Sequence, residues 1–147
     1  MRFGLMAPVA LALGILVSPD ARAQAASDED LRRVVADYVG LYRRDTLDAW
    51  RALFLPGFTA ASTRADGSVL VRTLDKFFEA QKRYLGSGRA IREVLEQTRF
   101  ERHGRLASVW SDFVLTDEGE TSRGRLVLTL IAENGRFRIH SLMFSYD

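Results

Sequence analysis

Acid–base chemistry has few candidate residues in this 147-residue chain. A proton-transfer site needs a buried carboxylate or imidazole with a polarising hydroxyl opposite it. We identify one such combination, Glu96 as base with Tyr38 or Tyr42 as acid. Burial would have to raise the pKa of Glu96 for this role. The more ordinary interpretation is an exposed carboxylate paired with Arg92 or Arg99, with the two tyrosines as core aromatics at a pocket rim.

The remaining polar residues do not form a recognisable catalytic or metal-binding motif. His103 falls in a predicted turn and His140 on a predicted outer sheet face, so the two imidazoles are not expected to meet. No carboxylate cluster has metal-ligand spacing, and the chain has no cysteine, so we expect no metal, no cofactor and no disulfide. Trp50 is most simply a core anchor, or else one wall of a ligand pocket.

The first 23 residues have the features of a cleavable secretory signal. Arg2 precedes an apolar stretch over 5–17, and Ala21-Arg22-Ala23 supplies the small-residue cleavage pattern, with a second possible cut after Ala25. An apolar run of about 13 residues is short of the ~20 that a membrane-spanning helix needs. We therefore expect a periplasmic or secreted protein that is free of the membrane after cleavage, with an uncleaved anchor as the alternative.

Residues 24–147 are expected to form a single domain. Without the predicted signal, 19 basic and 18 acidic side chains remain, and they are interspersed along the chain. A nucleic-acid-binding protein normally carries a basic stripe or patch, so this class is not expected.

The coarse pattern is α+β, with helices first and a long antiparallel meander after them. We expect a helix from Asp28 capped by Ser27, and a short helix that runs through Phe54 and stops at Pro56-Gly57. A strand pair and a third helix from Leu74 to Leu85 follow. Turns at His103-Gly104, Glu118-Gly119 and Asn134-Gly135 separate four predicted strands, at 90–102, 105–117, 120–133 and 136–146.

The turns also predict which side chains share a face of the sheet. With two-residue loops, opposed residues follow directly from the register. The inner face then combines apolar residues with a polar row formed by Glu96, Ser111 and Ser141. The outer face includes Trp110, His140 and Phe144, and pairs Asp112 with Arg125. This register would place Arg102 opposite Arg105, and like charges in opposed positions are unfavourable. The first turn, and with it the face assigned to Glu96, is therefore the weakest part of the predicted register.

This order of elements resembles the nuclear transport factor 2-like superfamily. The segment Asp45 to Phe58 is similar to its loop, L-x-x-x-F and helix-stop pattern, and Gly135 to Ile139 to its closing G-x-W-x-I strand. The most similar subgroups are SnoaL-like and lumazine-binding-like domains. The resemblance implies a cone-shaped curled antiparallel sheet covered by three N-terminal helices, with a pocket for small hydrophobic molecules and homodimers through the outer sheet face. SnoaL-like sequences often carry H-x-H-x-S in the last strand, where this chain has Ser141, Met143 and Ser145.

We therefore expect an exported, non-catalytic domain that binds a small apolar or aromatic ligand. The predicted pocket residues are Tyr38, Tyr42, Trp50, Phe58, Phe77, Glu96, Ser111, Ser141 and Met143. One alternative is an enzyme of the isomerase, dehydratase or cyclase type that uses Glu96 with Tyr38 or Tyr42. The other is a protein-interaction module whose working surface is the outer face around Trp110, His140 and Phe144.

Overall fold

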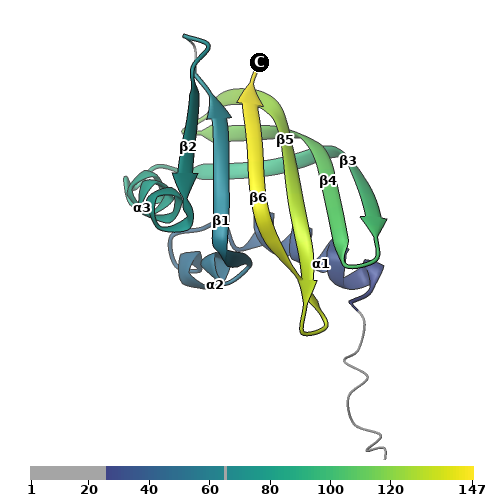
Figure 1. The fold of residues 1–147 in the computed structure, drawn as a ribbon. Helices are drawn as coiled ribbons and strands as arrows, with labels where there is room; N and C mark the ends of the chain where they lie inside the picture. The colour runs from purple at the N-terminus through teal and green to yellow at the C-terminus, as the bar shows by residue number, and fades with distance from the viewer. Residues whose placement is uncertain (1–25, 65) are drawn as a thin grey trace, which may run out of the picture.

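The computed structural model describes residues 26–64 and 66–147, and shows helices packed against one face of a curled, open sheet (Figure 1). The helices are α1 (Asp28–Gly40), α2 (Leu47–Arg51) and α3 (Leu74–Leu85). The strands are β1 (Phe54–Thr63), β2 (Val69–Thr73), β3 (Ile91–His103), β4 (Leu106–Asp117), β5 (Glu120–Glu133) and β6 (Arg136–Tyr146). The predicted signal over residues 1–23 lies outside the described residues.

The sheet has the strand order β2-β1-β6-β5-β4-β3. All neighbours pair antiparallel except β1 and β6, which run parallel. The α+β cone expected from the sequence is confirmed. The core lies between the concave side of the sheet and the helices, where Val109, Leu128 and Ile139 are completely buried.

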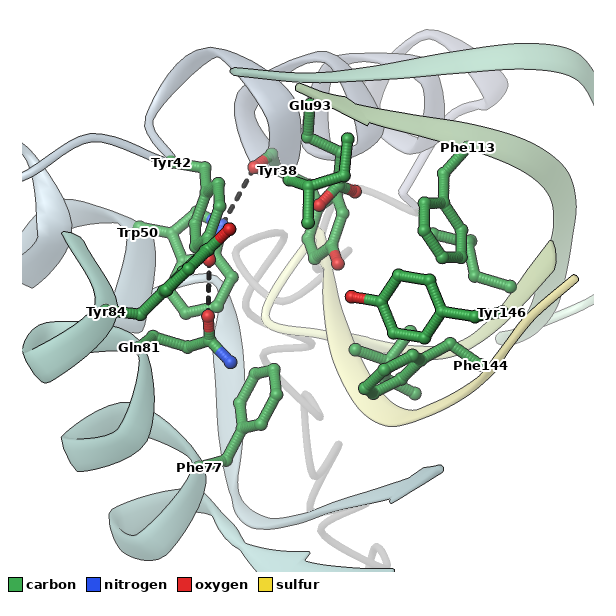
Figure 2. A pocket seen from close by; sticks show the side chains of 13 residues that line it. Tyr38, Tyr42, Trp50, Phe77, Gln81, Tyr84, Glu93, Phe113, Phe144 and Tyr146 are labelled. Atoms are coloured by element: carbon green, nitrogen blue, oxygen red, sulfur yellow. Dashed lines mark hydrogen bonds between the residues drawn. The ribbon is translucent and has the colours of Figure 1, made fainter. Parts of the chain in front are cut away.

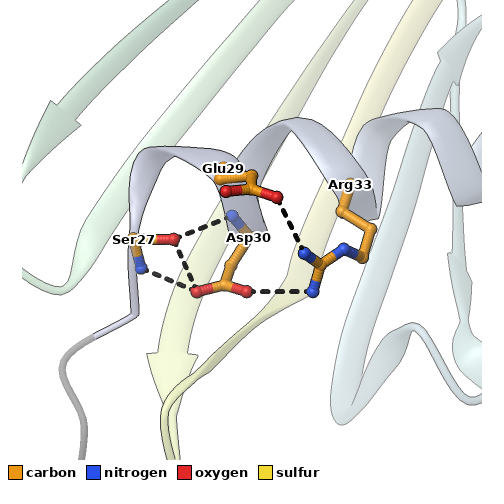
Figure 3. A network of polar contacts seen from close by, with 4 residues as sticks. All are labelled: Ser27, Glu29, Asp30 and Arg33. Carbon is orange, nitrogen blue, oxygen red and sulfur yellow. Dashed lines mark hydrogen bonds and ion pairs between the residues drawn. The ribbon is translucent and has the colours of Figure 1, made fainter.

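Helix α1 begins at a capping box (Figure 3). The backbone N–H of Asp30 donates to Ser27 Oγ over 3.1 Å, and the backbone N–H of Ser27 donates to Asp30 Oδ2 over 2.9 Å. These hydrogen bonds satisfy amide groups that a helix start leaves free, and the one that the Ser27 backbone donates to the Asp30 carboxylate lowers the pKa of Asp30. Arg33 pairs with Glu29 and Asp30, each at 3.2 Å. The predicted cap is confirmed, and it fixes the start of the helix that carries Tyr38.

The second helix is shorter than the sequence suggests. It ends at Arg51, and strand β1 already begins at Phe54. The prediction that Pro56-Gly57 stops a helix is wrong, because both residues lie within β1. The pairing of β1 with β6 shifts register between Phe54 and Thr59. Proline lacks an N–H and is tolerated at such an irregular place in a strand.

Strands β4 and β5 form a regular hairpin around Glu118-Gly119. The predicted register is confirmed: Leu115 pairs with Ser122, and Ser111 pairs with Leu126. Asp112 and Arg125 are opposed as expected, with 3.5 Å between the carboxylate and the guanidinium. Because side chains alternate along a strand, this register sends the apolar residues of both strands toward the helices.

Strand β3 is interrupted by a bulge between Glu96 and Arg99. Gln97 lies there with φ 53°, a left-handed conformation that non-glycine residues seldom adopt. Glu96 consequently pairs with Asp112 on the outer side, whereas Glu93 pairs with Leu115 on the inner side. The prediction that Glu96 faces inward is therefore wrong.

The first hairpin turn is also displaced from its predicted position. His103 pairs with Leu106, so Gly104 and Arg105 form the loop. Arg102 then faces Ala107, and the unfavourable opposition of two arginines does not arise. This displacement keeps each residue on its predicted face, because the register moves by an even number of positions.

Strand β6 has a second bulge, at His140. Ile139 still pairs with Leu130 as predicted, but Ser141 pairs with Thr129 and Leu142 with Leu128. One extra residue reverses the face of every residue that follows it. Ser141 and Met143 therefore lie on the outer side, and the predictions that place them in the pocket are wrong.

Candidate ligand-binding pocket

A cavity of about 230 Å³ lies between the helices and the ends of strands β3 to β6 (Figure 2). Its lining is mostly aromatic and aliphatic, and comprises Tyr38, Tyr42, Trp50, Phe77, Gln81, Tyr84, Glu93, Phe113, Leu115, Leu126, Leu142, Phe144 and Tyr146. Binding sites for small molecules generally combine such an apolar lining with a few polar groups. The volume is slightly below the range of about 300–1,000 Å³ that is usual for drug-sized ligands, so it suits a smaller molecule.

The helix-side wall is built around Trp50, which is 1% exposed. Its indole Nε1–H donates to the backbone oxygen of Tyr38 over 2.8 Å, which ties α2 to α1. The Trp50 ring centroid lies 5.2 Å from that of Tyr42 and 5.8 Å from that of Phe77. Such close, tilted aromatic contacts fix the ring positions beyond what burial alone does. Trp50 is therefore both a core anchor and a pocket wall.

The strand-side wall includes three aromatic residues from β4 and β6. The ring centroid of Phe113 lies 5.3 Å from that of Tyr146 and 6.5 Å from that of Phe144, both edge-on. Opposite Phe113 on β5 is Gly124. A Cβ atom there would lie 2.6 Å from the Phe113 ring and 2.2 Å from the Ser145 backbone oxygen. Glycine at this position thus leaves room for the Phe113 ring.

Two tyrosine hydroxyls of the pocket are engaged with other side chains. The Tyr42 hydroxyl donates to Gln81 Oε1. The Tyr84 hydroxyl donates to Asp117 Oδ2 over 2.8 Å, and Asp117 also pairs with Arg89 at 2.8 Å. Burial, followed by the hydrogen bond to Asp117, raises the pKa of Tyr84 to about 12. These contacts connect α3 to the segment between α1 and α2 and to the turn of the β4–β5 hairpin at the cavity.

Glu93 supplies the single carboxyl group of the described lining. Its Oε1 atom is buried and has no hydrogen-bond partner among the described residues. Burial raises the pKa of Glu93 to about 7. Burial, and then the nearby Glu93 charge, also raise the pKa of the Tyr38, Tyr42 and Tyr146 hydroxyls. A carboxyl group that titrates near neutral pH inside an apolar cavity can hold or release a proton, or accept a hydrogen bond from a ligand.

Four of the residues predicted for the pocket line it, namely Tyr38, Tyr42, Trp50 and Phe77. Phe58 is 1% exposed and packs behind the wall, with its ring centroid 5.4 Å from that of Phe77.

Glu96 is an exposed carboxylate, as its ordinary interpretation requires. Its partner differs from the two expected, since the structure pairs it with Arg123 at 3.4 Å.

The predicted serines and Met143 lie away from the cavity. The buried Ser111 hydroxyl donates to the Glu96 backbone oxygen over 2.8 Å and lies 2.9 Å from Thr98 Oγ1, beside the β3 bulge. The Ser141 hydroxyl lies 2.6 Å from Thr129 Oγ1 on the outer side, and Met143 is 49% exposed. These hydroxyl groups hold bulged strands in place instead of contacting the pocket.

Two of the three residues predicted for the outer surface are exposed. Trp110 is 53% exposed and His140 is exposed. Phe144 lines the cavity, so its assignment to the outer face is wrong. The reason is again the bulge at His140, which reverses the faces after it.

Sequence reasoning missed Glu93 and Tyr146 as pocket residues. The alternation of Ile91, Glu93 and Leu95 is a signal that could place Glu93 on an apolar face. This alternation was not used, because a register counted without interruption from the turn places Glu96 on the inner face. Only a bulge between the turn and Glu93 reverses that assignment.

The described part of the chain offers neither a cluster of metal ligands nor a membrane-spanning helix. Residues 26–64 and 66–147 hold no group of three or more His, Asp or Glu side chains arranged for a metal ion. In the same ranges, no helix is long and apolar enough to cross a bilayer.

Solved structures with the same fold cover most of this chain. Aln2 from a Streptomyces species superposes with a TM-score of 0.66 and 18% identity, over 84% of this chain and 95% of its own. A proposed dehydratase of the NTF2-like family from Streptomyces avermitilis superposes with a TM-score of 0.68 and 11% identity, over 81% of this chain and 94% of its own. An NTF2-like protein of unknown function from Shewanella baltica superposes with a TM-score of 0.63 and 13% identity, over 82% of this chain and 93% of its own. At these identities the likeness concerns the fold.

No curated protein matches the chain in sequence. The model of the SnoaL-like domain family matches residues 31–146, from α1 to the end of β6. The match includes every residue that lines the cavity. This chain belongs to the SnoaL-like domain family, within the NTF2-like superfamily.

Proposed function

We propose that this domain binds a small aromatic or apolar molecule in the cavity, and that Glu93 contacts the polar group of that molecule. The supporting observation is the buried Glu93 Oε1, which has no hydrogen-bond partner among the described residues and lies within an aromatic lining. An unpaired buried carboxyl oxygen costs stability, which a hydrogen bond from a ligand would recover. The cavity of about 230 Å³ suits a ligand built on one aromatic ring.

Trp50 gives a direct test, because its indole forms part of the pocket wall. The chain has two tryptophans, so a Trp110→Phe variant leaves Trp50 as the only one. Titration with one-ring compounds should change the Trp50 fluorescence until the site is saturated, and should raise the melting temperature as the ligand concentration exceeds Kd.

A cavity-filling variant, Leu115→Trp, should remove this binding. Val114→Trp places the same side chain at the next position of β4, which points to the other face, and should retain it. Failure of a broad one-ring library to bind the parent protein, or equal binding by both variants, would refute the proposed site.

A second candidate function is proton transfer by Glu93. Its raised pKa of about 7 suits a general acid or base at neutral pH, and the Tyr38 and Tyr146 hydroxyls lie on the same cavity. This replaces Glu96, whose exposed position leaves it unsuited to that role. A proposed dehydratase has the same fold, and at 11% identity this likeness concerns the fold alone.

Proton transfer would convert the bound molecule or exchange its protons, whereas binding alone would leave it unchanged. Ligands that bind should be followed by NMR in deuterated water for exchange at carbon positions next to a carbonyl. Exchange that is lost in Glu93→Gln would establish catalysis. Binding without exchange or product would favour the non-catalytic function.

We further propose that the domain acts outside the cytoplasm and forms a homodimer through the outer sheet face. The location outside the cytoplasm rests on residues 1–23 of the sequence alone. The homodimer is supported by the exposure of Trp110 (53%) and Met143 (49%) on the outer face. Light scattering of the parent and of Trp110→Lys tests the dimer, and a monomeric parent would refute it. N-terminal sequencing of the expressed protein tests the cleavage.

A further inference from the structure

We propose that the ligand is cationic: a small aromatic or apolar ammonium compound whose N–H group donates to Glu93. This inference rests on the proposed function, because it names the class of molecule that the same cavity takes. It starts from the charges of the lining. Glu93 is the only ionic side chain of the described lining, which contains no Lys, Arg or His.

The donors near Glu93 are either already used or make no hydrogen bond with it. The Tyr42 and Tyr84 hydroxyls donate to Gln81 and Asp117. The Tyr38 and Tyr146 hydroxyls make no hydrogen bond to Glu93 Oε1, which is buried and unpartnered within the described part of the chain. An ionised carboxylate in this place needs a counter-charge and a donor. An ammonium group supplies both.

The walls of the cavity suit a cation as well as an apolar ring. Eight aromatic side chains line it: Tyr38, Tyr42, Trp50, Phe77, Tyr84, Phe113, Phe144 and Tyr146. Figure 2 shows these rings on both sides of the space, with Glu93 at one edge. Aromatic faces attract ammonium groups, more strongly where water is excluded. A ligand with a carboxylate or phosphate would instead meet the Glu93 charge without a neutralising cation.

Basic residues do approach Glu93 from its other side, but they do not pair with it. Glu93 also borders a separate groove of about 730 Å³ between α1 and β3, where Arg32, Arg43 and Arg92 contribute to the lining. No ion pair of the described residues joins any of these arginines to Glu93. The groups that face Glu93 within the cavity are the tyrosines Tyr38, Tyr42 and Tyr146. A counter-charge for Glu93 would therefore have to come from the cavity side.

The test compares ammonium compounds with neutral analogues of the same shape. Benzylammonium and 2-phenylethylammonium are titrated into the full protein beside benzyl alcohol and 2-phenylethanol, by calorimetry at about pH 8.5 and about pH 5.5. The Glu93 pKa of about 7 lies between these values, and the ammonium groups keep their charge at both. We expect the ammonium compounds to bind about 30-fold more weakly at the lower pH, following the ionised fraction of Glu93. The alcohols should bind equally at both.

Two glutamate variants separate a local charge effect from a general one. Glu93→Gln should abolish both the preference for ammonium compounds and the pH dependence of their binding, while the alcohols should still bind. Glu96→Gln is the matched control, because it removes an exposed carboxylate three positions further along the same strand and should behave like the parent.

The outcomes distinguish the inference from the proposed function. Alcohols that bind as tightly as the ammonium compounds at about pH 8.5, or an ammonium preference that survives in Glu93→Gln, would overturn the cationic ligand and leave a pocket for neutral molecules. If neither class binds, the proposed function fails together with the inference. Binding of the ammonium compounds that requires Glu93 and its ionised form supports both.

Discussion

The β4–β5 hairpin and the β6 strand both supply the pocket, but they do so by different means. In the hairpin, pairing is regular from the turn to the far end, and alternate residues such as Phe113 and Leu115 face the helices. In β6, the bulge at His140 interrupts the alternation, so that Ile139 and Leu142 both point inward. The bulge of β3 has the same effect on Glu93. Local pairing irregularities thus decide which polar group enters an otherwise apolar cavity.

Leu142→Ala should have the largest effect, because the bulge at His140 turns this side chain, which is 2% exposed, into the core. We expect the free energy of unfolding to fall by about 4 kcal/mol, since the loss of a buried leucine leaves a cavity. Urea unfolding followed by circular dichroism measures this. Met143→Ala is the matched control on the outer face, where the side chain is 49% exposed, so a comparable loss in that variant would contradict the faces that the bulge sets.

Glu93→Gln should stabilise the protein in a pH-dependent manner. The pKa of Glu93 is raised from about 4.5 to about 7 on folding, so the protonated form favours the folded state. That stability is complete below the unfolded value and is lost as the pH rises through the folded value. At about pH 8.5 the glutamine variant should gain at most about 3 kcal/mol over the parent, and below about pH 4 it should gain little.

Thermal unfolding across this pH range measures the difference, with Glu96→Gln as the control on the outer face. A gain that does not depend on pH would show that the Glu93 charge is not the cause. A similar gain in Glu96→Gln would show that the bulge does not separate the two carboxylates.

Gly124→Ala tests the regular hairpin. The added Cβ would lie 2.6 Å from the Phe113 ring and 2.2 Å from the Ser145 backbone oxygen. Relief of these clashes must move Phe113 toward the cavity or separate β5 from β6, at a cost of about 2 kcal/mol. Urea unfolding gives the stability, and a lower ligand affinity would show that Phe113 has moved into the cavity. Ser122→Ala, on the exposed part of the same strand, should change stability by less than about 0.5 kcal/mol.

Tyr84→Phe should have the smallest effect of the four. It removes the hydroxyl that donates to Asp117 over 2.8 Å at the end of the hairpin, and leaves Arg89 as the partner of that carboxylate. We expect a loss of about 1 kcal/mol in the free energy of unfolding. A double-mutant cycle with Asp117→Asn measures the coupling between the two side chains, and additive effects would argue against a stabilising contact.

Much of the fold was predictable because its signals are local. Ser27 and Asp30 have capping-box spacing, and the predicted cap forms. The turn at Glu118-Gly119 sets the register of β4 and β5 within one short segment. The pocket residues on helices, such as Tyr38 and Phe77, were predictable for the same reason, since helical periodicity places them on the apolar face.

The site was less predictable where one bulged residue determines which side chains of a strand face the cavity. The extra residue at His140 moves Phe144 into the cavity and Ser141 out of it. No sequence feature of β6 marks that position, because its bulge follows from how β6 pairs with β1 on one side and with β5 on the other. Likewise, Pro56-Gly57 indicates a helix end in sequence but lies in a strand.

The sequence by itself determined the class of fold, the helix starts, two of the three hairpin turns and the aromatic character of the interior. These depend on residue type and on spacing over a few positions. The tertiary structure alone decided that the carboxyl group in the cavity belongs to Glu93 and not to Glu96. Side chains alternate with a period of two, so a single bulge reverses every later residue, and the position of a bulge depends on strands that are distant in sequence.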